Sequence, residues 1–251
     1  MTINQVLLAG YENLASVDSA DFDGTNDYMR RVGFTGAADS KSGILSAWIR
    51  LDDGDGSVHV ILDGIEVAVS FAFVRVDTTN TLRIDGDNTS GILILRLTSD
   101  TAYTAGATWL HVLASWDLAV AAGHLYINDV EDLAAGPTLT DDTIDYTVTT
   151  WTIGANSGAG FKTNGCLAEF YFAPGQFLDF SVEANRRKFI SESGKPVYLG
   201  TTGNLPTGTT PLVYQHLDDT EAVANFATNR GTGGDFTITG TLDTGSTSPS
   251  D

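Results

Sequence analysis

Eight residues with the composition of a buried strand form the stretch Trp109–Trp116 (WLHVLASW). A second run, Ile44–Leu51 (ILSAWIRL), has the same length and also places a tryptophan among apolar residues. Continuous apolar runs of this length, rich in aromatic and branched side chains, are typical of strands inside a sandwich. The two runs therefore predict the central strands of an all-β domain, with Trp48 and Trp116 in its core.

Strand-like runs recur along most of the chain between clusters of Gly, Asp, Asn and Thr. Working outward from the first two, they occupy residues 58–62, 65–76, 81–84, 92–97, 124–127, 130–133, 146–153 and 166–172. Turn-forming pairs, Asp63-Gly64 and Asn128-Asp129, separate some of them, and Asp85–Asn88 predicts another turn. Only residues 181–190 have helical spacing. A series of strands with one short helix predicts an antiparallel β-sandwich.

The charge of the chain is strongly negative. Thirteen Lys and Arg face 32 Asp and Glu, which gives a net charge of −19. Such a field repels nucleic acid phosphates and anionic lipids, so we expect neither nucleic acid nor a membrane as partner. Of the 32 acids, 25 are Asp and seven are Glu. Because Asp favours turns and Glu favours helices, this excess agrees with a loop-rich β protein.

The single cysteine and the N-terminal residues indicate the cellular compartment in which the chain folds. Cys166 excludes an internal disulfide and enters an apolar run, so we expect a buried thiol and not a nucleophile. The N-terminal residues lack the basic region and the long apolar run of a signal peptide. We therefore expect a chain that is folded in a cytoplasm, whatever the place where it acts.

Taken in order, the predicted strands resemble the laminin-G-like, pentraxin-like branch of the concanavalin A-like lectin/glucanase superfamily. The resemblance covers roughly residues 21–190 and rests on these segments: Phe22–Tyr28 (FDGTNDY), Ile44–Ile49, Thr108–Asp117, Leu125–Val130 (LYINDV), Trp151–Ala155 and Gly165–Phe172 (GCLAEFYF). It implies a jelly-roll sandwich. Ala168 stands where the family has the Asp of an Asp-Glu pair, which weakens an inherited metal site.

The C-terminal part resembles extensions on lectin-fold proteins of tailed bacteriophage virions. The residues concerned are 187–200, 206–208 and 229–236, and 212–215 and 236–238 are short strand candidates. We expect an N-terminal arm (1–17), a jelly-roll sandwich (18–190) and a turn-rich extension (191–251) that packs on the sandwich or docks it elsewhere. The Ser/Thr/Gly-rich composition predicts a flexible tail from about residue 242.

Glycoside hydrolysis requires two carboxylates about 5–10 Å apart on one face. The seven Glu residues are isolated, and none repeats along a strand at even spacing with a second acid. The four histidines lie in or beside strand runs, and the chain lacks a Gly-x-Ser-x-Gly elbow. We therefore expect no catalytic residues.

Calcium is the one cofactor that the residue types favour, because Asp-rich turns supply the oxygen ligands it needs. By family position its ligands would be Asp23, Asp27 and Glu169. The acidic stretches 52–55 and 85–88 are further candidates, although neither has the full EF-hand pattern. Acidic turns are also common without any ion, so a solvated turn stays an alternative.

A sugar-binding surface needs exposed aromatic rings beside polar side chains. Asn156 and Phe161, in the Gly-rich loop 156–161, and Tyr103 are the candidates. Our first hypothesis is a non-enzymatic structural protein on a bacteriophage virion surface, a capsid decoration or fibre component with weak glycan adhesion. Its partners would be other virion proteins and further copies of itself. The alternative is a calcium-assisted carbohydrate-binding module, and a glycoside hydrolase ranks third.

Overall fold

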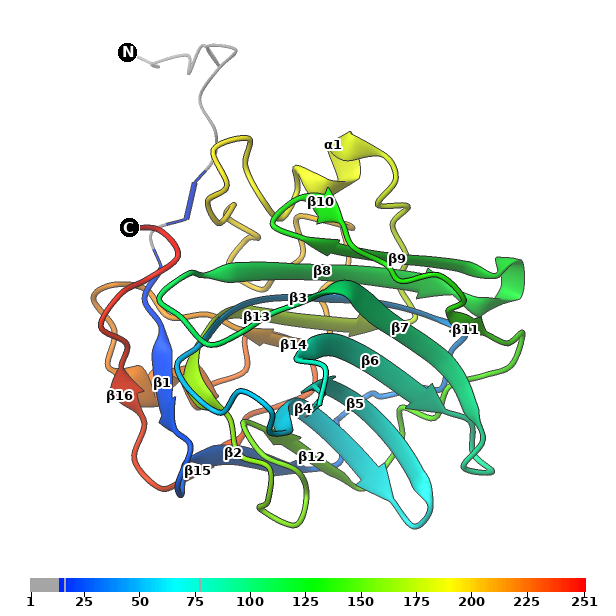
Figure 1. Cartoon of the computed structure of the whole chain (residues 1–251), viewed down its shortest axis with the longest axis horizontal. Coiled ribbons are helices and arrows are strands. Elements are labelled where there is room, and N and C mark those ends of the chain that lie inside the picture. Colours follow the sequence, from blue (N-terminus) through cyan, green and yellow to red (C-terminus); the bar gives the residue numbers. More distant parts are fainter. Residues whose placement is uncertain (1–13, 16, 77) are drawn as a thin grey trace.

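Two antiparallel sheets lie face to face in the computed structural model, which describes residues 14, 15, 17–76 and 78–251. Figure 1 shows β8 (Leu110–Asp117) and β3 (Ser42–Leu51) in one layer, and β5 (Val69–Arg75) and β6 (Thr81–Asp87) in the other. We call these layers the first and the second sheet. This arrangement confirms the predicted all-β antiparallel sandwich.

The first sheet has the strand order β10-β9-β8-β3-β13-β1-β16, and β14 pairs with a further part of β13. Its remaining strands are β1 (Ala20–Asp23), β9 (Ala122–Ile127), β10 (Val130–Glu131), β13 (Asn164–Pro174), β14 (Val213–Gln215) and β16 (Asp243–Thr244). β13 is the longest strand of this sheet and lies between β3 and β1. The two candidate strands of the extension are present as β14 and as β15 of the second sheet.

The second sheet has the order β11-β7-β6-β5-β4-β12-β2-β15. Its remaining strands are β2 (Tyr28–Val32), β4 (His59–Glu66), β7 (Leu93–Ala102), β11 (Thr138–Leu139), β12 (Thr150–Ile153) and β15 (Thr237–Thr239). One edge of this sheet is therefore formed by β15, which comes from the C-terminal extension and pairs with β2.

The main hydrophobic core fills the space between the two sheets. Trp116 from the first sheet and Trp151 from the second are fully buried there. Phe71 lies between them, with ring centroids 5.8 Å from Trp116 and 6.0 Å from Trp151. Nε1 of Trp116 donates a hydrogen bond to the Tyr146 hydroxyl at 2.9 Å, so the one polar group of its ring is satisfied.

Trp48 does not lie in this core, contrary to the prediction. Its ring is buried on the outer side of the first sheet, where it stacks on His111 at 4.7 Å and packs with Ile190. Side chains alternate between the two faces of a strand. Because Ala47 and Ile49 face the core, Trp48 must face outward, where Ile190, the last residue before the extension, packs on it.

One of the predicted turns, Asp63-Gly64, lies inside strand β4. The ring of Trp151 covers Gly64 so closely that an added Cβ would come within 2.5 Å of it. Gly64 therefore makes room for core packing and does not form a turn. The predicted Asn128-Asp129 turn is confirmed, with φ values of 51° and 66° that suit a tight hairpin.

The helical content is smaller than predicted. α1 (Glu183–Arg186) has four residues where spacing predicted a helix over 181–190, and its N-cap Val182 offers no side-chain hydrogen bond. Two short 3₁₀ turns, η1 (Leu118–Val120) and η2 (Val223–Ala227), are also present. None of the described helices is long and apolar enough to cross a membrane.

Residues 176–190, together with the extension, cover the outer side of the first sheet. A second hydrophobic cluster forms there, and its larger members are Ile44, Leu113, Tyr126, Tyr171, Phe180, Phe189, Leu199 and Tyr214. Figure 1 shows α1 (yellow) above β9 and β10, two strands of the first sheet. Strands of the first sheet are consequently buried on both faces, which explains why β3, β8 and β13 have continuous apolar runs.

The last residues lie beside β1. β16 pairs with β1, and beyond it the hydroxyl of Ser250 donates to the carbonyl of Val17 at 2.9 Å. Nη1 of Arg50 donates to the Thr247 hydroxyl at 2.7 Å. The structure thus places residues 242–251, the predicted flexible tail, against the sandwich. Most of the predicted N-terminal arm, residues 1–13 and 16, lies outside the described residues.

A buried polar network joins the extension to β13. The Tyr214 hydroxyl donates to Glu169 at 2.8 Å, and His216 contacts the other oxygen of the same carboxylate. Nε2 of His216 lies 2.8 Å from Asp218, whose second oxygen is 3.6 Å from Arg230. Burial alone would lower the pKa of His216, but its two carboxylate partners outweigh that effect and raise it.

The raised pKa of His216 predicts a pH-dependent contribution to stability. A base with a higher pKa in the folded state stabilises fully below its unfolded pKa, near 6.5, and loses this contribution as pH rises through the folded value. We expect His216→Gln to remove this part of the pH dependence in urea unfolding measured between pH 5 and 9. His124→Gln is the matched histidine control. An unchanged pH profile in His216→Gln would contradict the assignment.

Candidate ligand-binding rim

Four connections meet at one end of the sandwich, and we call them the rim: residues 52–58, 78–80, 103–109 and 154–163. Strand register places them together. Ile49 pairs with Leu110 and Leu51 pairs with Gly165 in the first sheet. The strand end at His59 pairs with Arg75 in the second sheet. The acidic stretch 52–55, Tyr103 and the loop 156–161, which the sequence singled out separately, therefore share one end of the molecule.

Arg75 organises the rim from inside. Its side chain is fully buried, and Nη1 forms an ion pair with Asp55 at 2.9 Å while Nη2 donates to the carbonyl of Gly54. The same Asp55 oxygen accepts the backbone N–H of Ala105 at 2.8 Å. The Asn80 side chain accepts the N–H of Gly56 at 2.9 Å. A buried charge requires such partners, so three of the connections fold around one guanidinium.

His59 extends this network to the fourth connection. Its Nδ1 lies 2.8 Å from the carbonyl oxygen of Lys162, and its Nε2 lies 3.2 Å from that of Gly54. Burial, together with the nearby charge of Arg75, lowers the pKa of His59. The imidazole is therefore neutral at neutral pH, and its single N–H can donate to only one of these two carbonyl oxygens at a time.

A shallow groove of about 310 Å³ lies beside Tyr103. It is lined by Leu51, Ala102, Tyr103, Thr104, Ala105, Gly106, Thr108 and Leu110. The Tyr103 hydroxyl donates to Asp132 at 2.7 Å, and burial together with this carboxylate raises the pKa of Tyr103. The ring is thus held in one orientation beside small and hydroxyl-bearing residues.

The loop 154–163 presents an aromatic ring from a stabilised backbone. Asn156 accepts the N–H of Gly160 at 2.7 Å through its side chain, and Ser157 donates its N–H to Asp63 at 2.8 Å. Phe161 has a φ of 50° and is 58% exposed. Asn156 therefore orders the loop, and Phe161 is its exposed apolar residue.

The structure does not bring the three predicted calcium ligands together. Asp23 and Asp27 are neighbours, but Asp23 accepts the backbone N–H groups of Thr25 and Asn26, and Asp27 accepts that of Thr241. Glu169 lies five residues along β13 from Asn164, the partner of Asp23. At about 3.3 Å per residue this separation is about 16 Å. The Glu169 carboxylate belongs instead to the buried His216 network.

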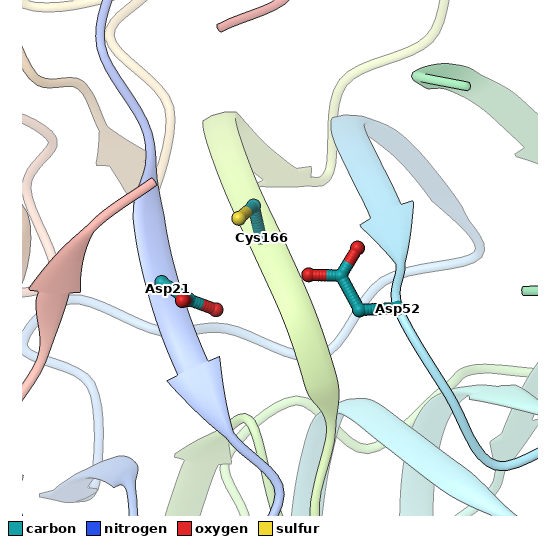
Figure 2. A group of neighbouring side chains, drawn as sticks. All are labelled: Asp21, Asp52 and Cys166. Atoms are coloured by element: carbon teal, nitrogen blue, oxygen red, sulfur yellow. The ribbon is translucent and has the colours of Figure 1, made fainter. Parts of the chain in front are cut away.

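One group of potential metal ligands lies elsewhere on the first sheet. Figure 2 shows Asp21 on β1, Cys166 on β13 and Asp52 just after β3. The potential ligand atoms of these three residues all lie within 4.8 Å of one another. Burial raises the pKa of the Cys166 thiol to about 12. Both oxygens of Asp52 accept hydrogen bonds from Arg50. Calcium needs six to eight oxygen ligands, so a protonated thiol and an engaged carboxylate do not suit it.

The stretch 85–88 is not an acidic turn. Asp85 and Asp87 lie within β6. Both oxygens of Asp85 accept hydrogen bonds from Arg96, at 2.7 and 2.9 Å, and Asp87 accepts from Ser70. These two acids share one strand at even spacing, a pair that the search among Glu residues missed. Because each is already engaged by a neighbouring side chain, the pair does not form a free acid and base.

A serine–histidine pair is present but does not form a catalytic arrangement. The Ser46 hydroxyl lies 2.9 Å from Nε2 of His111, and both residues are buried. Nδ1 of His111 has no hydrogen-bond partner among the described residues, so no carboxylate orients the ring. Burial lowers the pKa of His111 to about 3. This dyad lacks both solvent access and the third group that activates a nucleophile.

Arg75 and His59 were not recognised as organising residues from the sequence. A local signal for Arg75 exists, since one cation stands in the apolar run Val69–Val76 (VSFAFVRV). A charged residue at the end of a buried strand needs a partner from another segment. The sequence does not reveal that the partner is Asp55.

Asp55→Asn tests the role of Arg75 in ordering the rim. The substitution removes the only carboxylate that pairs with the buried guanidinium among the described residues. We expect a loss of about 2 kcal/mol in the free energy of unfolding. Asp53→Asn is the matched control, because the Asp53 side chain bonds only the adjacent Gly54 N–H. Equal urea midpoints for the two variants would contradict this role.

Comparison with solved structures concerns the fold. A candidate carbohydrate-binding protein from Bacteroides ovatus ATCC 8483 superposes with a TM-score of 0.63 at 15% identity, covering 92% of this chain and 60% of that one. The heptameric SAP-like pentraxin from Limulus polyphemus gives a TM-score of 0.46 at 14% identity, with 66% and 79% covered. Mouse laminin α1 domains LG4-5 give 0.45 at 15% identity, with 66% and 43% covered.

The present chain thus spans 60% of the length of the Bacteroides protein. No curated protein sequence matches it. A family profile matches residues 23–175, which include both sheets apart from strands β1, β14, β15 and β16. The chain belongs to the concanavalin A-like lectin/glucanases superfamily.

Proposed function

We propose that this protein is a non-enzymatic carbohydrate-binding module that holds a glycan at the rim. The observations that carry the proposal are two aromatic side chains at the rim, the half-buried Tyr103 beside its groove and the exposed Phe161, and connections ordered by the buried Arg75 and His59. Aromatic rings stack on the apolar faces of sugars, and the surrounding hydroxyl and backbone groups supply hydrogen bonds. A preformed rim lowers the conformational entropy that binding would otherwise cost.

Several features of the chain support binding without catalysis. The carboxylates that lie near one another on β6 are engaged by Arg96 and Ser70. The Ser46–His111 pair is buried. The Bacteroides protein that shares the fold is a candidate carbohydrate-binding protein. Calcium is not required in this proposal, because the contacts that shape the rim come from the chain itself.

The proposal also includes a place of action, the surface of a bacteriophage virion. It rests on the resemblance of residues 187–236 to virion extensions. Capsid or tail proteins and further copies of this chain would be the partners. Co-purification with virions and mass measurement by light scattering, with and without chelator, test this part. A stable oligomer that ignores chelator agrees with it, and a chelator-sensitive monomer contradicts it.

A glycan array with purified protein tests the binding function. We expect selective binding that chelator leaves unchanged, and Phe161→Ala should weaken it about tenfold, or about 1.4 kcal/mol. Val67→Ala is the matched control, because Val67 is 92% exposed and lies in the β4–β5 turn at the opposite end of the sandwich. Chromatography of the bound glycan should show no cleavage.

Two results would contradict the proposal. One is the absence of binding to every glycan presented. The other is equal binding by Phe161→Ala and Val67→Ala, which would place the site away from the rim.

A further inference from the structure

Two neighbouring arginines differ from all the others in the chain. The sequence has nine arginines and 32 acids. Seven of the nine form ion pairs with carboxylates: Arg50, Arg75, Arg83, Arg96, Arg186, Arg187 and Arg230. Within the described part of the chain, Arg30 and Arg31 have no carboxylate within 4.0 Å. In so acidic a protein, this pair of uncompensated cations calls for an explanation.

Both arginines line a hollow of about 350 Å³ at the edge of the second sheet. Its other lining residues are Tyr28, Val32, Asp235, Thr237 and Thr239. β15 supplies the two threonines, and register places Thr237 opposite Arg30 and Thr239 opposite Tyr28. Arg30 lies over the Tyr28 ring, 5.3 Å from its centroid. Tyr28, Arg30 and the two threonines therefore share one face of the sheet edge. Arg31, one residue further along β2, lines the hollow from the other face, and Asp235 adds a carboxylate that accepts the N–H of Asn229.

Contacts within the protein use only a few of the N–H donors of these two side chains. Arg30 donates from Nη2 to the carbonyl of Ser157. Arg31 donates to the carbonyl of Asp235 at 2.9 Å and to the Thr35 hydroxyl at 3.1 Å. A guanidinium carries five N–H donors, so most donors of the pair meet no protein acceptor. All three contacts are to neutral oxygens, which leaves both charges uncompensated.

Part of the hollow lies outside the segment that the family profile matches. The family profile ends at residue 175, whereas Asp235, Thr237 and Thr239 come from the C-terminal extension. The site exists only because the extension adds β15 to the edge of the sheet.

We propose that this hollow binds the carboxylate group of an acidic saccharide. The planar guanidinium matches a carboxylate in geometry and charge. The Thr237 and Thr239 hydroxyls suit the hydroxyls of the same sugar, and the Tyr28 ring offers an apolar face. The net charge of −19 repels anions at long range. Recognition therefore depends on short-range contacts with Arg30 and Arg31, which salt screens only in part.

This inference rests on the proposed function and deepens it by naming a class of sugar. The hollow adjoins the rim, because Arg30 donates to the carbonyl of Ser157 in the 154–163 loop. Thr239→Val leaves that contact in place, so it separates an effect on the hollow from an effect on the rim loop. The two are distinguishable, since Phe161→Ala alters the rim and leaves Arg30 in place. Binding of an acidic saccharide that survives Phe161→Ala and fails with Arg30→Gln would support the hollow, whatever the outcome at the rim.

The test is calorimetric titration with 3′-sialyllactose and trigalacturonate, with lactose and galactotriose as neutral counterparts. We expect at least one acidic probe to bind at least tenfold more tightly than its neutral counterpart. Arg30→Gln should remove that preference. Lys41→Gln is the charge-matched control, because Lys41 pairs with Asp141 away from the hollow. Thr239→Val, which removes one exposed hydroxyl and keeps both cations, should weaken acidic binding about threefold.

Thermal unfolding of each variant checks that the fold is intact. If Arg30→Gln unfolds, Thr239→Val and Arg30→Lys, which keeps the charge but loses the planar group, decide the question. Equal affinities of the unaltered protein for acidic and neutral probes would overturn the proposal. So would an Arg30→Gln variant that is folded and binds acidic probes as tightly as Lys41→Gln.

Discussion

The buried guanidinium of Arg75 is the constraint on which the rim depends. A charge removed from water at the end of a sandwich is stable only when carboxylate and carbonyl oxygens surround it. Asp55 and Gly54 supply those oxygens, and Asp55 in turn accepts the Ala105 N–H. The 52–58 and 103–109 connections are therefore positioned by one cation and not by their own sequence preferences.

The C-terminal extension decides which surfaces remain for ligands. Together with residues 176–190 it packs a second apolar cluster on the outer side of the first sheet, and its Tyr214 and His216 enclose Glu169 in a buried network. The same extension contributes β15 to the edge of the second sheet. The groups that we propose to bind ligands consequently lie at the rim and at the β2–β15 edge.

Much of the fold could be predicted from the sequence, because strand length and apolar composition are local properties. The runs around Trp116 and Trp151, and the Asn128-Asp129 turn, needed no knowledge of distant residues. Gly64 looked like a turn because the Trp151 ring that covers it comes from far along the chain. Trp48 looked like inter-sheet core because Ile190, which packs on its ring on the outer side of the sheet, comes from far along the chain.

The candidate site was predictable in part for the same reason. Tyr103 and the loop around Phe161 were recognised as exposed aromatic positions, yet only strand register shows that they share one end. Glu169 occupies the position of a metal ligand in the family that the sequence resembles. In the structure it lies at a bulge in β13, where its own φ is 47°, and its carboxylate contacts His216. Arg30 and Arg31 went unnoticed, since the absence of a carboxylate partner is a property of three-dimensional structure.

The most direct test of the account is an NMR titration of isotope-labelled protein with the glycan that gives the strongest array signal. If the rim is the binding surface, we expect the largest changes in backbone chemical shift in residues 103–109 and 154–163. The chemical shifts of the first-sheet strands that the extension covers should stay unchanged. Shifts confined to the extension, or spread evenly over the chain, would contradict it.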